Sequence, residues 1–372
     1  MGEVVSPALA RMQALGFLKQ APVRGVSRRT PIARSETAEC SAALRYPPAL
    51  RDTPGHLARQ QVAHADTRCY QGSLREIAAL VPAFDRRPLA DEGSRADSAH
   101  PHLDVVMRRA GPGVGLLDMP VGVVTRRHQL LPHGRVIEAI DRALGLLRAD
   151  PAQSTAALAL TDFGARMALS VDLPQRFDLD PGDGQALGLR LLCSNAVNGG
   201  GLRLLMTWHR RVSDSAIAVG TSRLEYRLAH RLPARLCDIV PGVKTAIERA
   251  QSERESLAQW CKQLLSRDAL AAWSDGPVRR MWGRRSAARV FHICMTGWDA
   301  EPAFSVERSQ PTRRTMQASD PVPGAPMFAE SAYDALLALA WVSRDARDEQ
   351  ERFDRLVEGA VLMRALLRGS AQ

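Results

Sequence analysis

The stretch from 188 to 230 constrains the fold more than any other part of this chain. It contains apolar runs at 189–193, 202–209 and 216–220, followed by a basic run at 224–230. Short apolar runs bounded by Gly and Asn are typical of β-strands, and Gly supplies the positive φ angles that tight turns need. Because the connections have hairpin length, we expect an antiparallel or mixed sheet.

Strand patterns also precede this stretch. The apolar run at 119–124 predicts a strand, and so do the runs within 156–173 and 186–195. Between them, 135–150 has apolar residues at helical spacing, which predicts an amphipathic helix that ends before Asp150-Pro151. The residues expected on its buried face are Val136, Ile137, Ile140, Leu144 and Leu147.

The chain after Pro233 has helical periodicity. We expect one helix over 243–265, and two more near the end, joined near 344–349. The apolar positions expected in the first of these are Val243, Ile247, Ala250, Leu257, Cys261 and Leu264. We expect irregular structure at 275–290 and at 299–329, where Pro, Gly and Arg recur. Strands followed by helices predict an α+β fold, with a central mostly antiparallel or mixed sheet, flanking helices and a helical C-terminal region.

Three regions are predicted on this pattern. Residues 1–105 form a basic, irregular N-terminal region, with a short helix at 73–80 and a linker or surface loop at 86–101. Residues 106–235 form a sheet-rich core, and residues 236–372 form a mainly helical part packed on that core.

Charge points to polyanionic partners. The formal net charge is +10, and only Lys19, Lys244 and Lys262 among the 50 Lys and Arg residues are lysines, which leaves 47 arginines. Arginine binds phosphate with two parallel hydrogen bonds, so the balance favours DNA or RNA as a partner. The codon usage of a GC-rich genome explains the same skew without a ligand, and both explanations stay open.

The cysteine and motif patterns predict a cytoplasmic protein. Six separated cysteines without a CxxC pair indicate reduced thiols rather than a zinc site or a disulfide scaffold. No apolar run approaches the roughly 20 residues that a membrane span needs. We expect no cofactor and no metal, because no phosphate loop, nucleophile elbow or zinc-binding motif occurs. Protein partners and an oligomer stay open.

Several segments resemble a family known from phage- and plasmid-borne proteins, the domain of unknown function numbered 932. The quoted segments are GVVTRRHQLLPHGRVIEAIDRAL, TDFGARMALSVDLP, SNAVNGGGLRLL, WHRRVSDSAIAVG, the downstream His230, and YDALLALAWVS near the end. The resemblance implies a mobile-element setting and leaves the reaction unassigned. A Val-Cys-Ser-Asn-Gly segment of the family is here Val212-Ser213-Asp214-Ser215-Ala216, which lacks its Cys and Gly.

Arginines near aromatic residues are the candidate nucleic-acid-binding residues. The strongest group lies at 279–285, where an indole could stack on a base between arginines that bind phosphate. The alternative is a solvated basic loop with its Trp packed back on the core. The candidates are Arg279, Arg280, Trp282, Arg284, Arg285, Arg126, Arg127, Arg203, Arg210, Arg211, Arg223 and Arg227. Arg203 and Arg227 are expected on the polar face of neighbouring strands.

These observations favour a nucleic-acid-binding accessory protein of a mobile genetic element, which contacts the backbone without catalysis. One alternative is a structural or interaction subunit of a mobile-element or defence ribonucleoprotein complex. The other is a metal-dependent nuclease that uses carboxylates from Asp162, Asp172, Asp178, Asp180 and Asp183.

Overall fold

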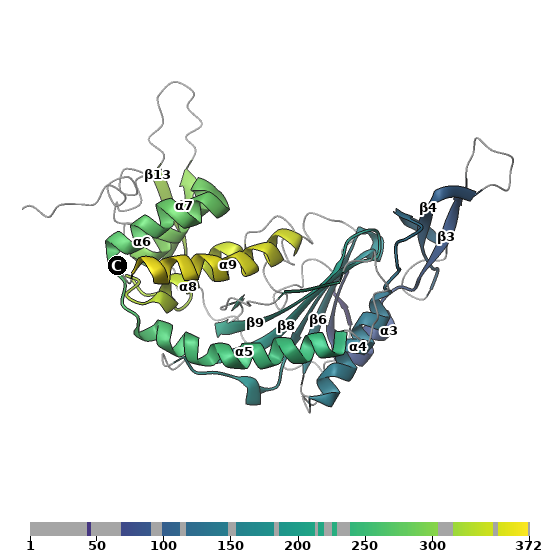
Figure 1. Ribbon diagram of the computed structural model, residues 1–372, viewed down its shortest axis with the longest axis horizontal. Coiled ribbons are helices and arrows are strands. Elements are labelled where there is room, and N and C mark those ends of the chain that lie inside the picture. Colours follow the sequence, from purple (N-terminus) through teal and green to yellow (C-terminus); the bar gives the residue numbers. More distant parts are fainter. Residues whose placement is uncertain are drawn as a thin grey trace, which may run out of the picture.

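The computed structural model confirms the α+β fold. It describes residues 43–45, 68–90, 99–111, 117–147, 154–181, 186–212, 215–218, 225–228, 239–303, 315–344 and 349–370. The described chain is elongated, with a small three-stranded sheet at one end, the main sheet in the middle and a helical part at the other end (Figure 1).

The main sheet is antiparallel and contains eight strands among the described residues, in the order β1-β2-β6-β7-β8-β9-β10, with β11 also paired to β9. Its strands are β1 (Ala43–Arg45), β2 (Arg68–Gly72), β6 (Thr155–Thr161), β7 (Arg166–Asp172), β8 (Leu187–Ala196), β9 (Leu202–Val212), β10 (Ser215–Ala218) and β11 (Glu225–Leu228). The strands predicted within 156–230 are confirmed. The main sheet also takes in β1 and β2, which lie within the region expected to be irregular.

One face of the main sheet carries the core. Alternate residues of the strands, such as Leu158, Met167 and Leu191, are buried there. They pack against α3 (Leu74–Leu80), α4 (His133–Leu146) and α5 (Ile239–Lys262). The short helix at 73–80 is confirmed, because Ser73 and Glu76 form a capping box at its start.

The predicted burial of the two long helices is mostly confirmed. Val136, Ile137, Ile140 and Leu144 of α4 are buried, but α4 ends at Leu146, before the expected proline. In α5 the predicted apolar positions from Val243 to Leu257 are buried. Leu264 was expected on that face and lies exposed, because the helix ends at Lys262.

The small sheet consists of β3 (Phe84–Ala90), β4 (Ala99–Arg108) and β5 (Met119–Thr125) in that order. The strand predicted at 119–124 is confirmed, but it belongs to this sheet and not to the central one. The linker predicted at 86–101 is wrong wherever the structure describes it. The alternation of apolar and polar residues that marks a strand is missing here, because charged residues also occupy the face turned toward the main sheet. Arg86 and Asp104 form an ion pair on that face (3.0 Å).

The C-terminal part is mainly helical. It contains α6 (Arg267–Trp273), a π-helical turn (Ser274–Val278), α7 (Arg279–Thr296), α8 (Ala332–Ser343) and α9 (Glu349–Gly369), with the hairpin β12 (Trp298–Ala303) and β13 (Thr315–Pro321). Helix α9 reaches back to the second face of the main sheet, where Phe353 and Leu356 pack on Leu192 and Leu205. The two final helices predicted from the sequence are confirmed.

Two predictions for this part are wrong. Residues 275–290 are helical rather than irregular. Pro277 does not end the helical run, because it lies within the π-helical turn, and the backbone of α7 departs from helical angles at Gly283. The region 299–329 is not irregular throughout, because the antiparallel strands β12 and β13 cover 298–303 and 315–321. The first of these strands is held by Asp299, which accepts hydrogen bonds from Arg289 (2.5 and 2.9 Å) and from the Trp341 indole (2.8 Å). Burial alone raises the pKa of Asp299, but these hydrogen bonds outweigh burial and leave the pKa below its usual range.

We expect Leu144→Ala to lower the free energy of unfolding by about 2–5 kcal/mol, because it leaves a cavity in the core. Leu146→Ala is the matched control, since the same change occurs on the same helix at a side chain that is 70% exposed. It is expected to change stability by about 0.5 kcal/mol or less. Urea unfolding of both variants measures the difference, and equal losses would contradict the burial of Leu144.

Candidate nucleic-acid interface

A strained turn stands at the end of the main sheet that faces the small sheet. Asp162–Gly164 connects β6 to β7, and Phe163 has φ 56° and ψ 27°, in the left-handed region. Among the described residues no other non-glycine has a positive φ. A left-handed conformation costs a residue with a Cβ about 1–2 kcal/mol. Gly164 follows at φ 88°, where a Cβ would lie 2.9 Å from the Pro82 ring.

Three consecutive carbonyl groups of this turn are held by three different elements. Arg108 at the end of β4 donates to Phe163 O (2.9 Å), and the first residue of α4, His133, donates to Gly164 O (2.9 Å). The backbone N–H of Val197, which follows β8, donates to Ala165 O (2.9 Å). The turn is therefore fixed from the small sheet, the core helix and the neighbouring hairpin at once.

His133 is itself fixed by a buried asparagine. Asn195 Nδ2 donates one proton to His133 Nδ1 (2.9 Å) and the other to Leu131 O (2.9 Å). Since Nδ1 accepts, the proton of the neutral imidazole lies on Nε2, which suits donation to Gly164 O. His133 and Asn195 are both fully buried, and the Phe84 ring packs edge-on against the imidazole.

A second histidine joins the turn to the small sheet. His128 is buried and donates from Nε2 to Val197 O (3.2 Å), while Arg86 donates to His128 O and to Arg126 O. Burial is the main cause that lowers the pKa of His128, and the nearby Arg86 charge lowers it further. The neutral imidazole is therefore the form that the fold stabilises.

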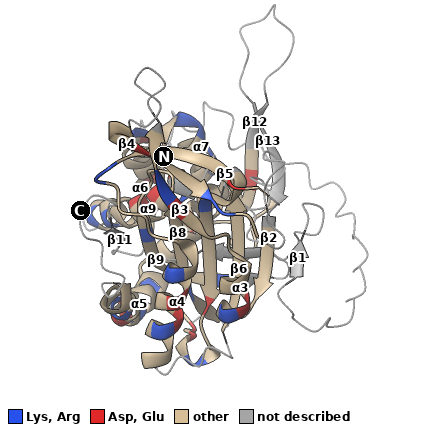
Figure 2. Ribbon diagram, turned by 90° about the vertical axis from the view of Figure 1, so that its right-hand side faces the viewer, with Lys and Arg blue, Asp and Glu red and all other residues tan. Residues whose placement is uncertain are grey.

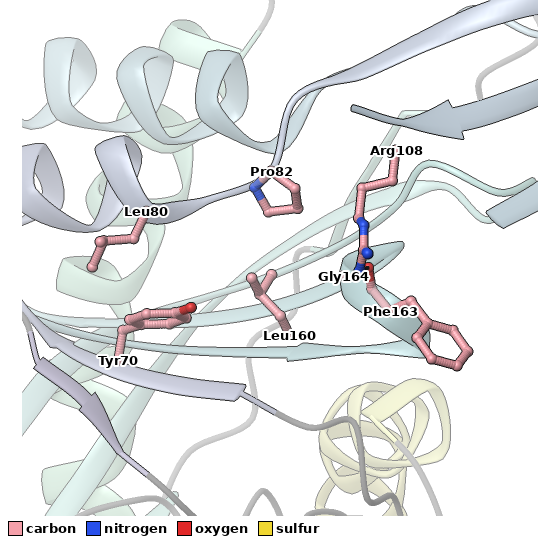
Figure 3. Close-up of a pocket in the computed structure, with 7 residues that line it drawn as sticks. All are labelled: Tyr70, Leu80, Pro82, Arg108, Leu160, Phe163 and Gly164. Carbon is pink, nitrogen blue, oxygen red and sulfur yellow. Dashed lines mark hydrogen bonds between the residues drawn. The ribbon is translucent and has the colours of Figure 1, made fainter. Parts of the chain in front are cut away.

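The Phe163 ring projects outward from this rigid turn. It is 54% exposed, and in Figure 3 it lies on the outer side of the turn, away from Tyr70 and Leu160. Beside it is a small hollow with about 240 Å³ of empty space, part of which is open solvent. The lining residues are Tyr70, Leu80, Pro82, Arg108, Leu160, Phe163 and Gly164.

Cations lie close to the turn. Arg126 and Arg127 are exposed directly before His128, and Arg166 is exposed at the start of β7. Arg126 shares Asp104 with Arg86, at 3.6 and 3.0 Å. Within the part of the chain that the structure describes, Arg127 has no ion pair or hydrogen bond through its side chain.

The opposite face of the small sheet is neutralised. Arg87 and Arg109 there each contact both Asp85 and Asp118, at 2.6–3.2 Å. The Ala110 N–H and the Arg87 guanidinium hold the pKa of Asp118 below its usual range. On the side of the main sheet, by contrast, Arg86 and Arg126 share the one carboxylate of Asp104.

The second basic group, at 279–285, lies on α7 in the helical part, at the far end of the molecule from the small sheet (Figure 1). Figure 2 draws the Lys and Arg residues of the described ribbon in blue. Arg280 and Arg284 are exposed, and neither has a side-chain partner among the described residues. Arg279 pairs with Asp275 (3.0 Å), and Arg285 is exposed.

The indole of this group is turned inward. Trp282 packs against the main core and donates to Glu358 of α9 (2.8 Å), with the Arg355 guanidinium 5.7 Å from its ring. The arginines of this group are therefore exposed, whereas its Trp side chain packs inside the fold and cannot stack on a base in this arrangement.

The two candidate sheet arginines whose side chains the structure describes, Arg203 and Arg210, are buried and do not lie on the exposed basic face that strand alternation predicts. Arg203 is buried, pairs with Asp354 (2.8 Å) and lies over the Phe353 ring (5.0 Å). Arg210 is also buried, with its guanidinium against Gly324. The side chains of Arg211 and Arg227, and the whole of Arg223, lie outside the described residues. The predicted pairing of 202–209 with 224–230 is confirmed, with Arg203 opposite Arg227.

Metal-binding geometry is not found in the part of the chain that the structure describes. No three or more His, Cys, Asp and Glu residues lie where they could hold an ion together. Asp172, one of the carboxylates of the nuclease alternative, is bound by Arg190 at 2.5 and 2.9 Å. The side chain of Asp162 and the whole of Asp183 lie outside the described residues.

The four described cysteines form no disulfide among the described residues, and Cys69, Cys193 and Cys294 are buried. Burial raises the pKa of Cys69 to about 12, so its thiol stays protonated and unreactive. Among the described helices, none combines the length and the apolar character that crossing a bilayer requires.

The chain was compared with protein-family models, curated proteins and solved structures. None of the three comparisons found a match. The resemblance to the domain of unknown function numbered 932 therefore stays a prediction. The structure does bring three of its quoted segments together, since His133, Gly164 and Asn195 come from different ones and form one hydrogen-bonded chain.

Sequence reasoning missed Phe163. The available signal was an Asp-Phe-Gly turn between two apolar runs, which placed a large aromatic residue at the tip of a hairpin where polar residues and glycine are usual. The sequence pattern also did not indicate the roles of His128 and His133, which both hold backbone carbonyls.

We expect Phe163→Gly to be more stable than Phe163→Ala by about 1 kcal/mol, because only glycine adopts this backbone conformation without strain. The two variants remove nearly the same side chain, so their difference reports the backbone alone. Urea unfolding measures it. An alanine variant as stable as the glycine variant would contradict the left-handed conformation at this position.

We expect stability to fall as the pH drops below about 6.5, partly through His128. Its pKa is lower in the folded chain than in the unfolded one, so protons bind the unfolded chain first and the stabilisation is present only above that pH. His128→Gln should reduce the loss between about pH 7.5 and about pH 5.5. His102→Gln is the control at an exposed position, and equal slopes for both variants would refute a role for His128.

Proposed function

We propose that this protein is a nucleic-acid-binding accessory protein that contacts the sugar-phosphate backbone and has no catalytic role. The observation that carries the proposal is the set of exposed arginines around the Phe163 turn, held on a rigid junction of two sheets. The planar guanidinium of arginine binds phosphate with two parallel hydrogen bonds, and the backbone that carries Arg126 and Arg127 is held at this junction by His128. The mobile-element setting rests on the sequence resemblance alone.

The charge of this end supports the proposal. Over 84–128 the sequence has seven arginines against five aspartates and one glutamate, which is a net charge of +1. The excess is local: on the side of the small sheet that meets the main sheet, Arg86 and Arg126 share the carboxylate of Asp104, and the Arg127 side chain has no ion pair among the described residues. Such a local excess attracts phosphate groups and speeds their encounter.

The exposed pair at the far end supports a second contact. Arg280 and Arg284 lie on α7, and their charges are not neutralised by any described residue. A flexible strand or a duplex that reached both ends would bind with added affinity, because the second contact forms within one complex.

Binding should fall steeply with salt, because each phosphate that is neutralised releases counterions. Fluorescence anisotropy on labelled single-stranded DNA, duplex DNA and RNA over a salt series measures this. Replacing Arg126 and Arg127 by Ala should weaken binding and reduce the salt slope by about 0.7–0.9 for each phosphate that the variant no longer neutralises.

The double change of Arg280 and Arg284 to Ala tests the far end in the same way. Arg364 and Arg368 on α9 form the matched control, because they are exposed and their replacement removes the same charge. If the wild-type protein binds none of the probes, or if all three double variants bind equally, the proposed function is wrong.

A further inference from the structure

We infer that the ligand is a single strand and that the Phe163 ring stacks on one of its unpaired bases. The inference rests on the proposed function and deepens it, because it names the class of nucleic acid and the residue that selects it. It depends on three features of the turn, which are its exposure, its rigidity and its strain.

Exposure comes first. An aromatic ring that is 54% exposed at the tip of a hairpin presents an apolar surface to a ligand. Every base has a π-face, so stacking on such a ring needs no particular sequence. In a duplex both faces of each base are already stacked, and separating them costs free energy that the contact must offset. An unpaired base reaches the ring without that cost.

Rigidity comes second. The carbonyls of Phe163, Gly164 and Ala165 are each held by a hydrogen bond from a different element. A ring on a fixed backbone has only its own two side-chain torsions to lose when it stacks. The support continues inward through the buried pair of His133 and Asn195, which places the turn on the core rather than on a mobile loop.

Strain comes third. Glycine at position 163 would adopt this backbone conformation freely, yet the chain carries a bulky aromatic residue whose ring remains mostly in solvent. Strained backbone persists where the surrounding structure enforces it, and it gathers at functional sites. Glycine at this position would therefore give a more stable fold, and we infer that the aromatic side chain is present because it contacts a ligand.

The surrounding charges fit the same ligand. Arg126 and Arg127 lie on the turn that His128 connects to Val197, and Val197 binds the Phe163 turn through Ala165. Arg166 begins the strand that follows the turn. A strand whose base stacks on Phe163 would thus have arginines from two neighbouring segments available for its phosphates, and single-strand binding combines aromatic residues and cations in this way.

The test uses the full chain and two fluorescein-labelled probes, an oligothymidylate of about 16 nucleotides and a duplex of the same length. Phe163→Ala should lower the affinity for the single strand about five- to hundred-fold and leave its salt slope unchanged. Phe163→Trp should retain the affinity. Met327→Ala, at an apolar side chain that is 82% exposed in the helical part, is the control.

Phe163→Gly separates function from folding. It should bind the single strand as poorly as Phe163→Ala while unfolding at a higher urea concentration, so a loss of binding cannot be assigned to misfolding. A probe that contains 2-aminopurine should lose fluorescence on binding the wild-type protein and lose less on binding Phe163→Ala, because stacking quenches this base.

The outcomes are distinct. If the wild-type protein binds and the Arg126 and Arg127 variant weakens binding, but Phe163→Ala binds the single strand like wild type, the stacking inference is overturned and the proposed function stands. Equal losses for single strand and duplex in Phe163→Ala would overturn the preference for unpaired bases. If no probe binds at all, the proposed function fails and the inference fails with it.

Discussion

The hydrogen bond between His133 and Gly164 O is the interaction on which the arrangement around the turn depends. It joins the first residue of the core helix to the tip of the β6–β7 hairpin in a place that water does not reach. A buried carbonyl without a donor is costly, so the imidazole must keep its proton on Nε2. Asn195 ensures this by donating to the other ring nitrogen, and it thereby fixes the β8–β9 hairpin to the same point.

Two sheets meet at this junction, and glycines let them approach. A Cβ at Gly122 of β5 would lie 2.6 Å from Cβ of Asn198, so the small sheet packs closely on the turn after β8. Arg108 reaches across from the small sheet to Phe163 O, and Arg86 holds the carbonyl of Arg126 in the loop that leaves β5. The junction therefore binds the three carbonyls of residues 163–165 while it leaves the Phe163 ring and the outer arginines in solvent, and rigidity and exposure arise from one set of contacts.

Charge alone would have placed the proposed interface differently. The densest arginine run, at 279–285, turns its indole inward to Glu358, and the sheet arginines Arg203 and Arg210 are buried. Helix α9 engages both groups, because Asp354 and Phe353 hold Arg203 while Glu358 receives Trp282. Asp354 lies 151 positions after Arg203, and Glu358 lies 76 positions after Trp282. The sequence around Arg203 or Trp282 therefore does not indicate that its side chain is turned inward.

Local pattern was enough for the α+β class, for the strands of 156–230 and for the helices around Ile140, Val243 and Leu336, because hydrophobic periodicity and turn residues act within a few positions. It was also enough to mark Arg126 and Arg127 as candidates. Only the tertiary structure decided that β5 leaves the main sheet, that 275–290 is helical and that Phe163 is held in a left-handed conformation. The turn at Phe163 depends on hydrogen bonds of His133 with Gly164 and Asn195, which lie 31 and 62 positions away, and no short window of sequence contains both partners.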